Sequence, residues 1–388
     1  MPVRQFRDMR RCYGFEEVAI VPGDVTVNPE QTSIDLKLGN LTFPVPIMAA
    51  AMDAVVDPKF AVAFSKLGGL AVLNLEGVQA RYEKPDEILA EIAQAPMNQA
   101  TPLLQKVYSQ PIKEKLVGDR IREIKRNGGI CAVSVTPANT KKLASTVVEA
   151  GADVLVVAST VTTARHQSKS LKGLVFSELC KSIPIPVVVG NAVSYSAAME
   201  LMKTGIVGLL VGVGPGATCT TRQVLGIGVP QVTATMDCAA ARDEYFKKSG
   251  KYVAIITDGG IHAGSDLCKA FVAGADAVML GAILAQAVEA PGHGYHWGMA
   301  SPHPALPRGR RIKVDTRAPL QQILFGPPPQ SAMGLRTSSA LCGPPWASAA
   351  RPPSHRCMTW KWSSHRPSGQ KVSLGSFNRP ALNSRSHL

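Results

Sequence analysis

Eight short aliphatic runs recur along most of the 388-residue chain, and they set the tightest limit on how it folds. Each run is continuous and rich in Val, Ile, Leu and Ala, as parallel strands buried on both faces are. The runs are 47–51, 70–75, 130–135, 154–158, 187–190, 209–213, 253–257 and 277–281. Helical patterns lie between them at 58–67, 112–127, 140–150, 194–204, 239–248 and 265–273. This alternation predicts an α/β fold, a (β/α)8 TIM barrel over residues 1–325; the alternative is a doubly wound open sheet, which usually has fewer repeats.

Residues that carry chemistry follow these runs at the end where such a barrel gathers its active site. Met52 follows the first run, Asn74 the second, Asn191 the fifth, Cys219 the sixth, Asp258 the seventh, and Gly281 ends the eighth. Because the carboxyl ends of the strands meet at one mouth, we expect these residues to converge there.

The sixth run leads into a glycine-rich segment, GVGPGATCTTR at 212–222. Its glycines permit turns that a Cβ would forbid. A cysteine on an exposed turn after a strand suits a nucleophile, although a lone free cysteine is more often a buried packing residue. Arg222 would make the loop electropositive or, equally, form an ion pair on the barrel rim.

The segment Asp258-Gly259-Gly260 ends the seventh run and precedes a helix. Backbone N–H groups and the helix dipole make such a place an anion site. The Asp258 carboxylate would not favour a phosphate, but it could accept two ribose hydroxyls. The alternative is a turn with a capping aspartate.

Five segments, in this order along the chain, resemble the IMP dehydrogenase and GMP reductase family over residues 10–325. They are AMD at 51–53, GN at 190–191, GPGATCTTR at 214–222, DGGI at 258–261 with GADAVMLG at 274–281, and GM at 298–299. Segments 74–82 and 237–243 bring the chain closest to the short bacterial members without CBS domains. Only helix-like sequence fills 77–130, where longer members carry that regulatory pair, so we expect no nucleotide regulation through it.

The resemblance implies NAD-dependent oxidation of IMP to XMP in guanine nucleotide synthesis, through a thioimidate on a cysteine. It implies catalytic roles for Cys219, Thr221, Arg308 and Arg310, with a mobile flap at 300–325 that also holds Arg311. The implied nucleotide-binding residues are Met52, Asn191, Asp258, Gly259, Gly260, Gly281, Tyr295, Gly298 and Met299. The cofactor NAD would contact Thr160, Thr220 and Glu289, and the carbonyl oxygens of Gly214, Gly216 and Cys219 would hold K⁺.

The chain also departs from the family pattern. Ala50, Ala217 and Ala282 stand where relatives often place a serine, and 157–160 lacks the aspartate that contacts nicotinamide ribose. These departures keep open a GMP reductase, which would convert GMP to IMP with NADPH and share Cys219, Thr221 and Glu289. A purine-nucleotide-binding paralogue without turnover is a third possibility.

Charge and cysteine usage exclude several other classes of protein. Net charge is +14, but residues 326–388 hold eight basic and no acidic side chains, which leaves +6 on the body and argues against a nucleic-acid partner. The 8 Cys show no CxxC pair, so neither a zinc site nor a disulfide framework is expected. No run is long enough to span a membrane and no signal peptide is recognisable, so we expect a cytoplasmic location and no membrane partner. The family resemblance implies a homotetramer.

From residue 326 the sequence changes to a basic, proline-rich tail that holds three of the 4 Trp. Such a composition is typical of disorder, but a frameshift explains it better. Read one base earlier, plausible codons for 356–368 spell Met-His-Asp-Val-Glu-Val-Val-Ile-Ala-Pro-Ser, and 332–347 gains helical Leu and Val spacing. We therefore predict that the helix closing the barrel after the eighth strand is missing or replaced in the printed chain, which would fold poorly or aggregate.

Overall fold

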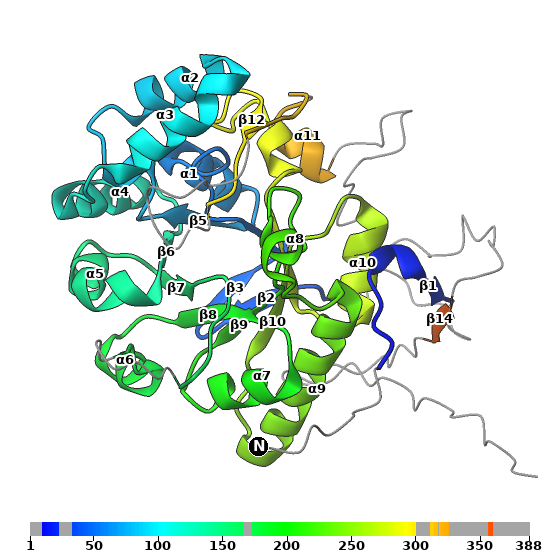
Figure 1. The fold of residues 1–388 in the computed structure, drawn as a ribbon. Coiled ribbons are helices and arrows are strands. Elements are labelled where there is room, and N and C mark those ends of the chain that lie inside the picture. Colours follow the sequence, from blue (N-terminus) through cyan, green and yellow to red (C-terminus); the bar gives the residue numbers. More distant parts are fainter. Residues whose placement is uncertain are drawn as a thin grey trace, which may run out of the picture.

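Eight parallel strands close into a barrel in the computed structural model, which describes residues 10–22, 33–165, 173–299, 311–316, 318–325 and 356–359 (Figure 1). The strands around the barrel are β10, β11, β4, β5, β6, β7, β8 and β9, and β9 pairs with β10 to close it. Their bounds are β4 Ile47–Ala49, β5 Leu70–Asn74, β6 Ala132–Val135, β7 Val154–Ala158, β8 Val187–Ala192, β9 Gly208–Val211, β10 Ala254–Asp258 and β11 Ala277–Leu280. The predicted TIM barrel is confirmed.

Helices lie outside the barrel and connect its strands (Figure 1). They are α1 Pro58–Lys66, α4 Glu114–Arg126, α5 Pro137–Glu149, α6 Phe176–Ser182, α7 Tyr195–Met202, α9 Gln231–Ser249 and α10 Gly264–Val272. Local sequence determines where α1 begins. The Asp57 carboxylate accepts the Phe60 N–H at 2.7 Å and so caps the helix, and Pro58 occupies the first helical position. Helix α6 was not predicted from the sequence, and α9 begins eight residues before the helix predicted at 239–248.

Successive strand residues alternate between the barrel interior and the helix layer. The interior cluster includes Met48, Val72, Val156, Val188 and Ile256. Their neighbours along the strands pack outward in a second cluster with the helices. Burial on both faces is why each strand reads as an unbroken aliphatic run.

The amino-terminal end of the barrel is closed by a hairpin of β2 (Leu36–Leu38) and β3 (Leu41–Phe43). Leu36, Leu38 and Phe43 are at most 1% exposed and belong to the interior cluster. The hairpin therefore plugs one end of the barrel and leaves the carboxyl ends of the strands for a site.

An excursion of two antiparallel helices leaves the barrel after β5. It begins with the short 3₁₀ turn η3 (Val78–Ala80), and its helices are α2 (Pro85–Gln94) and α3 (Met97–Ser109), which we call the α2–α3 hairpin. The Lys113 N–H donates to the Ala80 carbonyl at 2.8 Å, so the excursion leaves and returns at one point. Arg120 on α4 fastens its start by donating to the carbonyls of Tyr82 and Glu83. These helices fill the interval in which the sequence showed only helix-like residues.

The chain after β11 forms several short elements: η4 Leu284–Gln286, β12 Tyr295–His296, β13 Ile312–Lys313 and α11 Leu320–Phe325. Strands β12 and β13 pair antiparallel. Leu320 and Leu324 of α11 are buried in the core, so helix packing does begin after the eighth strand. Residues 326–355 lie outside the described residues, as does most of the region for which a frameshift is predicted.

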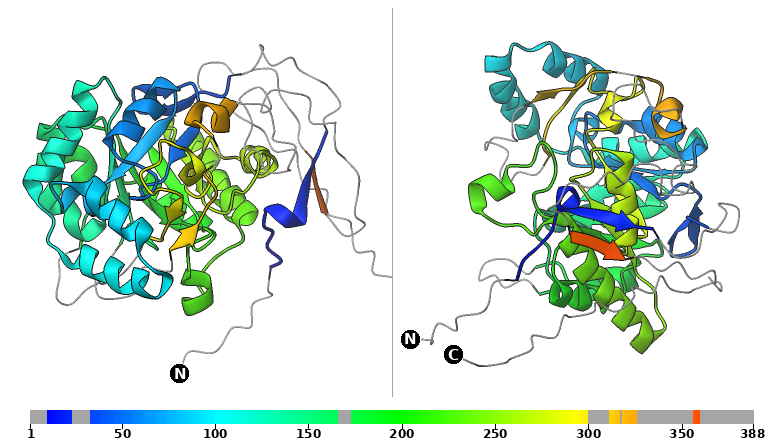
Figure 2. Two further views of the ribbon diagram at one scale, coloured as in Figure 1. Left: turned by 90° about the horizontal axis from the view of Figure 1, so that it is seen from above. Right: turned by 90° about the vertical axis from the view of Figure 1, so that its right-hand side faces the viewer.

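Two strands lie apart from the barrel. Strand β1 (Val18–Val21), which follows the 3₁₀ turn η1 (Phe15–Glu17), pairs in parallel with β14 (Arg356–Thr359) (Figure 2). Strand β14 is the described part of the tail. Among the described residues, no helix combines the length and apolar character needed to cross a membrane.

Candidate functional site

The loop between β9 and α9 carries Cys219 at the mouth of the barrel. The Cys219 side chain is half-buried, and its Sγ lies 3.2 Å from the Thr221 hydroxyl. The Cys219 N–H donates to the Gly216 carbonyl at 2.9 Å, which makes a tight turn just before the short helix α8 (Thr221–Leu225). The structure thus presents a thiol beside a hydroxyl at the end of a strand, as a nucleophile and a proton-handling partner require.

Glycines are needed at two points of this loop. Gly212 has φ +148°, and a Cβ there would lie 2.2 Å from the Asp258 carbonyl oxygen. At Gly214, with φ +77°, a Cβ would lie 2.5 Å from Cγ of Arg222. The loop therefore follows the neighbouring strand end and the arginine too closely for any side chain.

Arg222 stabilises the Cys219 loop through hydrogen bonds to its backbone carbonyls. Its Nε donates to the Val213 carbonyl at 3.0 Å, and its Nη2 donates to the Val229 carbonyl at 2.5 Å. Burial lowers the pKa of this guanidinium, and the nearby Cys219 opposes that effect. Of the two predicted roles, the rim ion pair is replaced by these carbonyl contacts, while the positive charge does lie beside the thiol.

Asp258 ends β10 and faces Asn191 at the end of β8. The Asn191 Nδ2 donates to Asp258 Oδ2 at 2.7 Å. Burial raises the pKa of Asp258 to about 6, and the Asn191 hydrogen bond acts in the opposite direction. A half-buried carboxylate with one oxygen already bound is oriented to accept hydroxyl groups from a ligand with its remaining lone pairs.

The cysteine loop packs directly on the glycines that follow Asp258. A Cβ at Gly259 would lie 3.0 Å from Cγ of Pro215 and 3.1 Å from the Gly216 nitrogen. A Cβ at Gly260 would lie 3.2 Å from Cβ of Pro215. Both glycines have positive φ. The thiol loop and the predicted phosphate–ribose segment are therefore one continuous surface.

The other predicted nucleotide residues lie in β12 or in the segments that follow β4, β11 and β12. Met52 packs on Gly281, where a Cβ would lie 2.8 Å from the methionine sulfur. Tyr295 lies in β12 with the Arg311 guanidinium 4.2 Å from its ring centroid. The half-buried Gly298 and Met299 follow, and Met299 ends the described segment. Ala50 and Ala282 are half-buried, Ala217 is exposed, and Ala50 packs against the interior cluster.

The residues predicted to contact NAD are more scattered. Thr160 and Thr220 are exposed, in the loop after β7 and at the start of α8, so their hydroxyls are accessible to a dinucleotide. Glu289 instead accepts the Leu320 N–H at 2.8 Å and thereby caps α11. Arg308 and Arg310 lie outside the described residues. Arg311 binds the α2–α3 hairpin, so it is not available as the base that activates water.

The predicted K⁺ site rests on backbone oxygens of the cysteine loop. Carbonyl oxygens are suitable donors for K⁺, and Gly214, Gly216 and Cys219 lie within one short turn. The Gly216 carbonyl, however, already accepts the Cys219 N–H, and three oxygens leave much of the ion's shell to other groups. The donor chemistry fits the ion, but this loop alone does not complete a site.

Gln231 was not found from the sequence, and Asp53 was known only as part of the segment at 51–53, without its contacts. The Gln231 Nε2 donates to the carbonyls of Val211 and Asp258 and so ties β9 to β10 below the thiol loop. Asp53 is fully buried and accepts the Val78 N–H at 2.8 Å and the Tyr108 hydroxyl at 2.6 Å. The sequence shows only an aspartate after Met52, because the partners Val78 and Tyr108 are distant in the chain.

Comparison with known proteins agrees with this geometry. A model of the IMP dehydrogenase / GMP reductase domain matches residues 12–300. An uncharacterized oxidoreductase of Mycolicibacterium smegmatis is 38% identical over 352 residues, which cover 87% of this chain and 94% of the relative. Inosine-5'-monophosphate dehydrogenase of Cryptosporidium parvum is 32% identical over 72% of this chain and 69% of its own length.

A solved structure agrees as well. The crystal structure of an IMP dehydrogenase/GMP reductase-like protein from Corynebacterium glutamicum superimposes with a TM-score of 0.79 at 35% identity, covering 87% of this chain and 90% of that one. With a thiol loop packed on a glycine-rich strand end and a family domain matched over most of the barrel, the chain belongs to the IMP dehydrogenase / GMP reductase family of oxidoreductases.

Proposed function

We propose that this chain oxidises IMP to XMP with NAD, using Cys219 as the covalent nucleophile. The observation that carries the proposal is the contact between the Cys219 loop and Gly259–Gly260, because it sets a thiol beside a site suited to ribose and phosphate. Asp258, held by Asn191, would accept the ribose hydroxyls, and the backbone N–H groups at Gly259, Gly260 and Gly281 would receive the phosphate.

The proposed chemistry is the one that the family resemblance implies, and the positions of the thiol and the hydroxyl support it. The Cys219 thiol gives up its proton to solvent as the sulfur adds to C2 of the hypoxanthine ring. A bound NAD, next to the exposed Thr160 and Thr220, would supply the acceptor for the hydride that leaves C2. A thioimidate then joins the purine to Cys219. Water adds to this carbon, the C–S bond breaks, and XMP leaves with the thiol restored. Thr221, whose hydroxyl lies 3.2 Å from the sulfur, is placed to pass a proton during the water step.

Reduction of GMP to IMP with NADPH is the second candidate. It is favoured by the end of β7, where the Ser159 and Thr162 hydroxyls lie 2.9 Å apart and Thr162 donates to the Gly190 carbonyl. These hydroxyls bind each other where standard dehydrogenases are expected to place a carboxylate on the nicotinamide ribose. The reductase would use the same thiol and the same ribose grip.

Nucleotide turnover by the Cys219→Ala variant tests the proposal. We expect the parent chain to form NADH from IMP and NAD, and the variant to lose at least about a thousandfold in rate while it still binds IMP. The matched control is Cys180→Ala, because Cys180 is half-buried on α6 and burial raises the pKa of its thiol to about 11. GMP with NADPH is assayed in parallel at the nicotinamide absorbance.

Three results discriminate between the candidates. Loss of NADPH with GMP, and no NADH from IMP, would replace the dehydrogenase with the reductase. Binding of IMP without turnover in either direction would indicate a nucleotide-binding paralogue. An unchanged rate in Cys219→Ala would refute covalent catalysis at this residue.

A further inference from the structure

The α2–α3 hairpin packs on the segment that leads to Met299. Figure 1 shows β12 beside α2 and α3, and a buried apolar cluster joins them. Its buried members are Ala54, Val78, Leu89, Ile92, Leu104, Val107, Tyr108 and Trp297. Trp297 is 0% exposed, so a large indole one residue before Gly298 is held within the hairpin's inner face.

A single phenol hydroxyl connects the polar groups of this contact. The Trp297 Nε1–H donates to the Tyr108 oxygen at 2.8 Å, and the Tyr108 hydroxyl donates to Asp53 Oδ2 at 2.6 Å. The same oxygen lies 3.5 Å from the Met299 sulfur. Tyr108 itself is fully buried, so these hydrogen bonds form where water does not compete. Through Tyr108, the residues on both sides of Gly298 are fixed to α3 and to Asp53 in the loop after β4.

A second contact, independent of the first, holds the same strand pair at the tip of the hairpin. Arg311, next to β13, donates from Nη1 to the carbonyls of Ile92 and Ala93 and from Nη2 to that of Ala95. These carbonyls end α2, where a helix leaves its last C=O groups unpaired and its dipole favours a cation. The guanidinium also covers the Tyr295 ring. Both strands of β12–β13 are therefore anchored on the hairpin.

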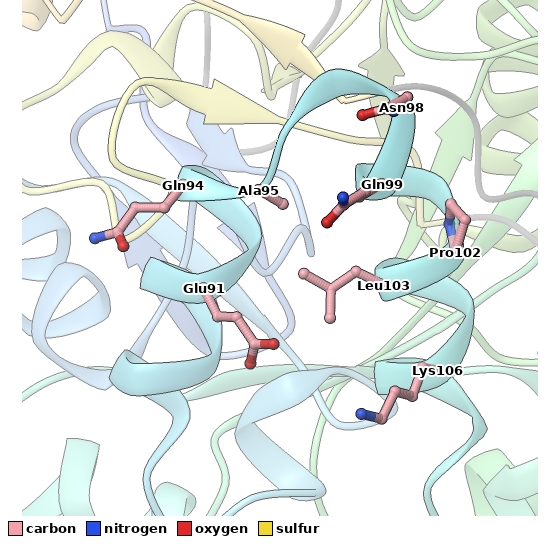
Figure 3. Close-up of a pocket in the computed structure, with 8 residues that line it drawn as sticks. All are labelled: Glu91, Gln94, Ala95, Asn98, Gln99, Pro102, Leu103 and Lys106. Carbon is pink, nitrogen blue, oxygen red and sulfur yellow. The ribbon is translucent and has the colours of Figure 1, made fainter.

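The space between the two helices of the hairpin is lined mainly by polar side chains. A hollow of about 530 Å³ between α2 and α3 is lined by Glu91, Gln94, Ala95, Asn98, Gln99, Pro102, Leu103 and Lys106 (Figure 3). Apart from Ala95, Pro102 and Leu103, these are amide or charged side chains. None of the buried members of the apolar cluster lines this hollow.

We propose that Tyr108 is a positioning residue, whose hydroxyl holds the Gly298–Met299 backbone where it reads the purine base. This inference rests on the proposed function, because it takes a purine nucleotide as the ligand. The ribose and phosphate grip belongs to β10 and β11, at Asp258, Gly259, Gly260 and Gly281. The hairpin therefore affects how the protein binds the purine base and does not affect how it binds the ribose and the phosphate.

The test compares Tyr108→Phe with Tyr82→Phe. The first change keeps the ring in its cluster but removes the partner of Trp297 Nε1 and one donor to Asp53. Tyr82→Phe is the matched control, because its hydroxyl donates to the Val107 carbonyl, at 3.1 Å, within the hairpin. Binding of IMP and of ribose 5-phosphate is measured by calorimetry, and amide exchange of residues 295–299 by mass spectrometry.

For Tyr108→Phe we expect the Kd of IMP to rise about tenfold and that of ribose 5-phosphate to stay within about twofold. Exchange at 297–299 should accelerate in the same variant. Tyr82→Phe should change neither quantity. Trp297→Phe removes the donor of the same hydrogen bond and should also weaken binding of IMP without weakening binding of ribose 5-phosphate. This variant replaces Tyr108→Phe in the test if Tyr108→Phe does not fold.

Two results would overturn the inference. An equal loss of affinity for both ligands would show a structural role only, and unchanged IMP binding with unchanged exchange would show no role at all. Failure of the parent chain to bind any purine nucleotide would overturn the proposed function together with this inference. A parent chain that binds IMP without turning it over would overturn only the proposed activity, because the comparison of affinities would still decide the role of Tyr108.

Discussion

Asp258, at the mouth of the barrel, lowers the stability of the unliganded protein and favours binding of a ligand with hydroxyl groups. Its carboxylate is taken from water by the surrounding loops, and a single amide, from Asn191, offsets that loss. Ribose hydroxyls would supply further donors to the charged form. The residue is therefore better satisfied with a nucleotide present than without one.

This imbalance predicts a pH-dependent gain in stability for Asp258→Asn. The pKa of Asp258 rises from 3.8 to about 6 in the folded chain, so its contribution to stability is full below about pH 4 and is lost as the pH rises to about 6. We expect the variant to raise the free energy of unfolding by about 1–3 kcal/mol at about pH 7.5 and by much less at about pH 4. Urea unfolding at the two pH values measures this. A gain of equal size at both would contradict burial of the carboxylate as its cause.

The two ends of the barrel have different roles, and different elements form them. The β2–β3 hairpin fills the amino-terminal end with Leu36, Leu38 and Phe43, far along the strands from Cys219 and Asp258. Residues that only fill this end should matter for stability and not for ligand affinity.

Phe43→Ala tests that division. Removing a fully buried ring should lower the free energy of unfolding by about 3–5 kcal/mol, because a cavity is left in the interior cluster. The Kd of IMP for the folded fraction should stay unchanged. Chemical denaturation and calorimetry give the two values, and a large change in Kd would show that the two ends of the barrel are coupled.

The elements also show what the sequence could predict. The strands were predictable because burial on both faces leaves unbroken aliphatic runs, and Cys219, Asn191 and Asp258 were placed because each follows such a run. The roles of Tyr108 and Gln231 were not predictable, since they arise from long-range contacts. Tyr108 is 55 positions from Asp53 and 189 from Trp297, and no local pattern records such a meeting.

For the whole molecule, the end of the chain decides whether the barrel is fully covered. The described part of helix α11 is Leu320–Phe325, and its Leu320 and Leu324 pack on the core. If the flank of the barrel needs a longer helix than the chain supplies, apolar surface stays exposed there. Such exposure matters because the free energy of unfolding of a domain is only about 5–15 kcal/mol.

We expect a chain with the alternative reading frame restored after residue 326 to be better behaved than the printed one. Size-exclusion chromatography should show aggregates for the printed chain and a monodisperse species for the restored chain, whose thermal unfolding should be cooperative. Equal monodispersity and equal unfolding temperatures would contradict the frameshift hypothesis, as would an uninterrupted frame on resequencing.

The single backbone hydrogen bond that joins Lys113 to Ala80 has an evolutionary consequence. An inserted unit that departs and returns at one spot can be exchanged for another without disturbing the scaffold, since loop length alone costs little. In this chain the unit is two helices that hold the β12–β13 strand pair through Trp297 and Arg311. Exchange of the segment between β5 and α4 is thus a route by which a barrel of this family gains or loses a unit that acts on its Gly298–Met299 segment.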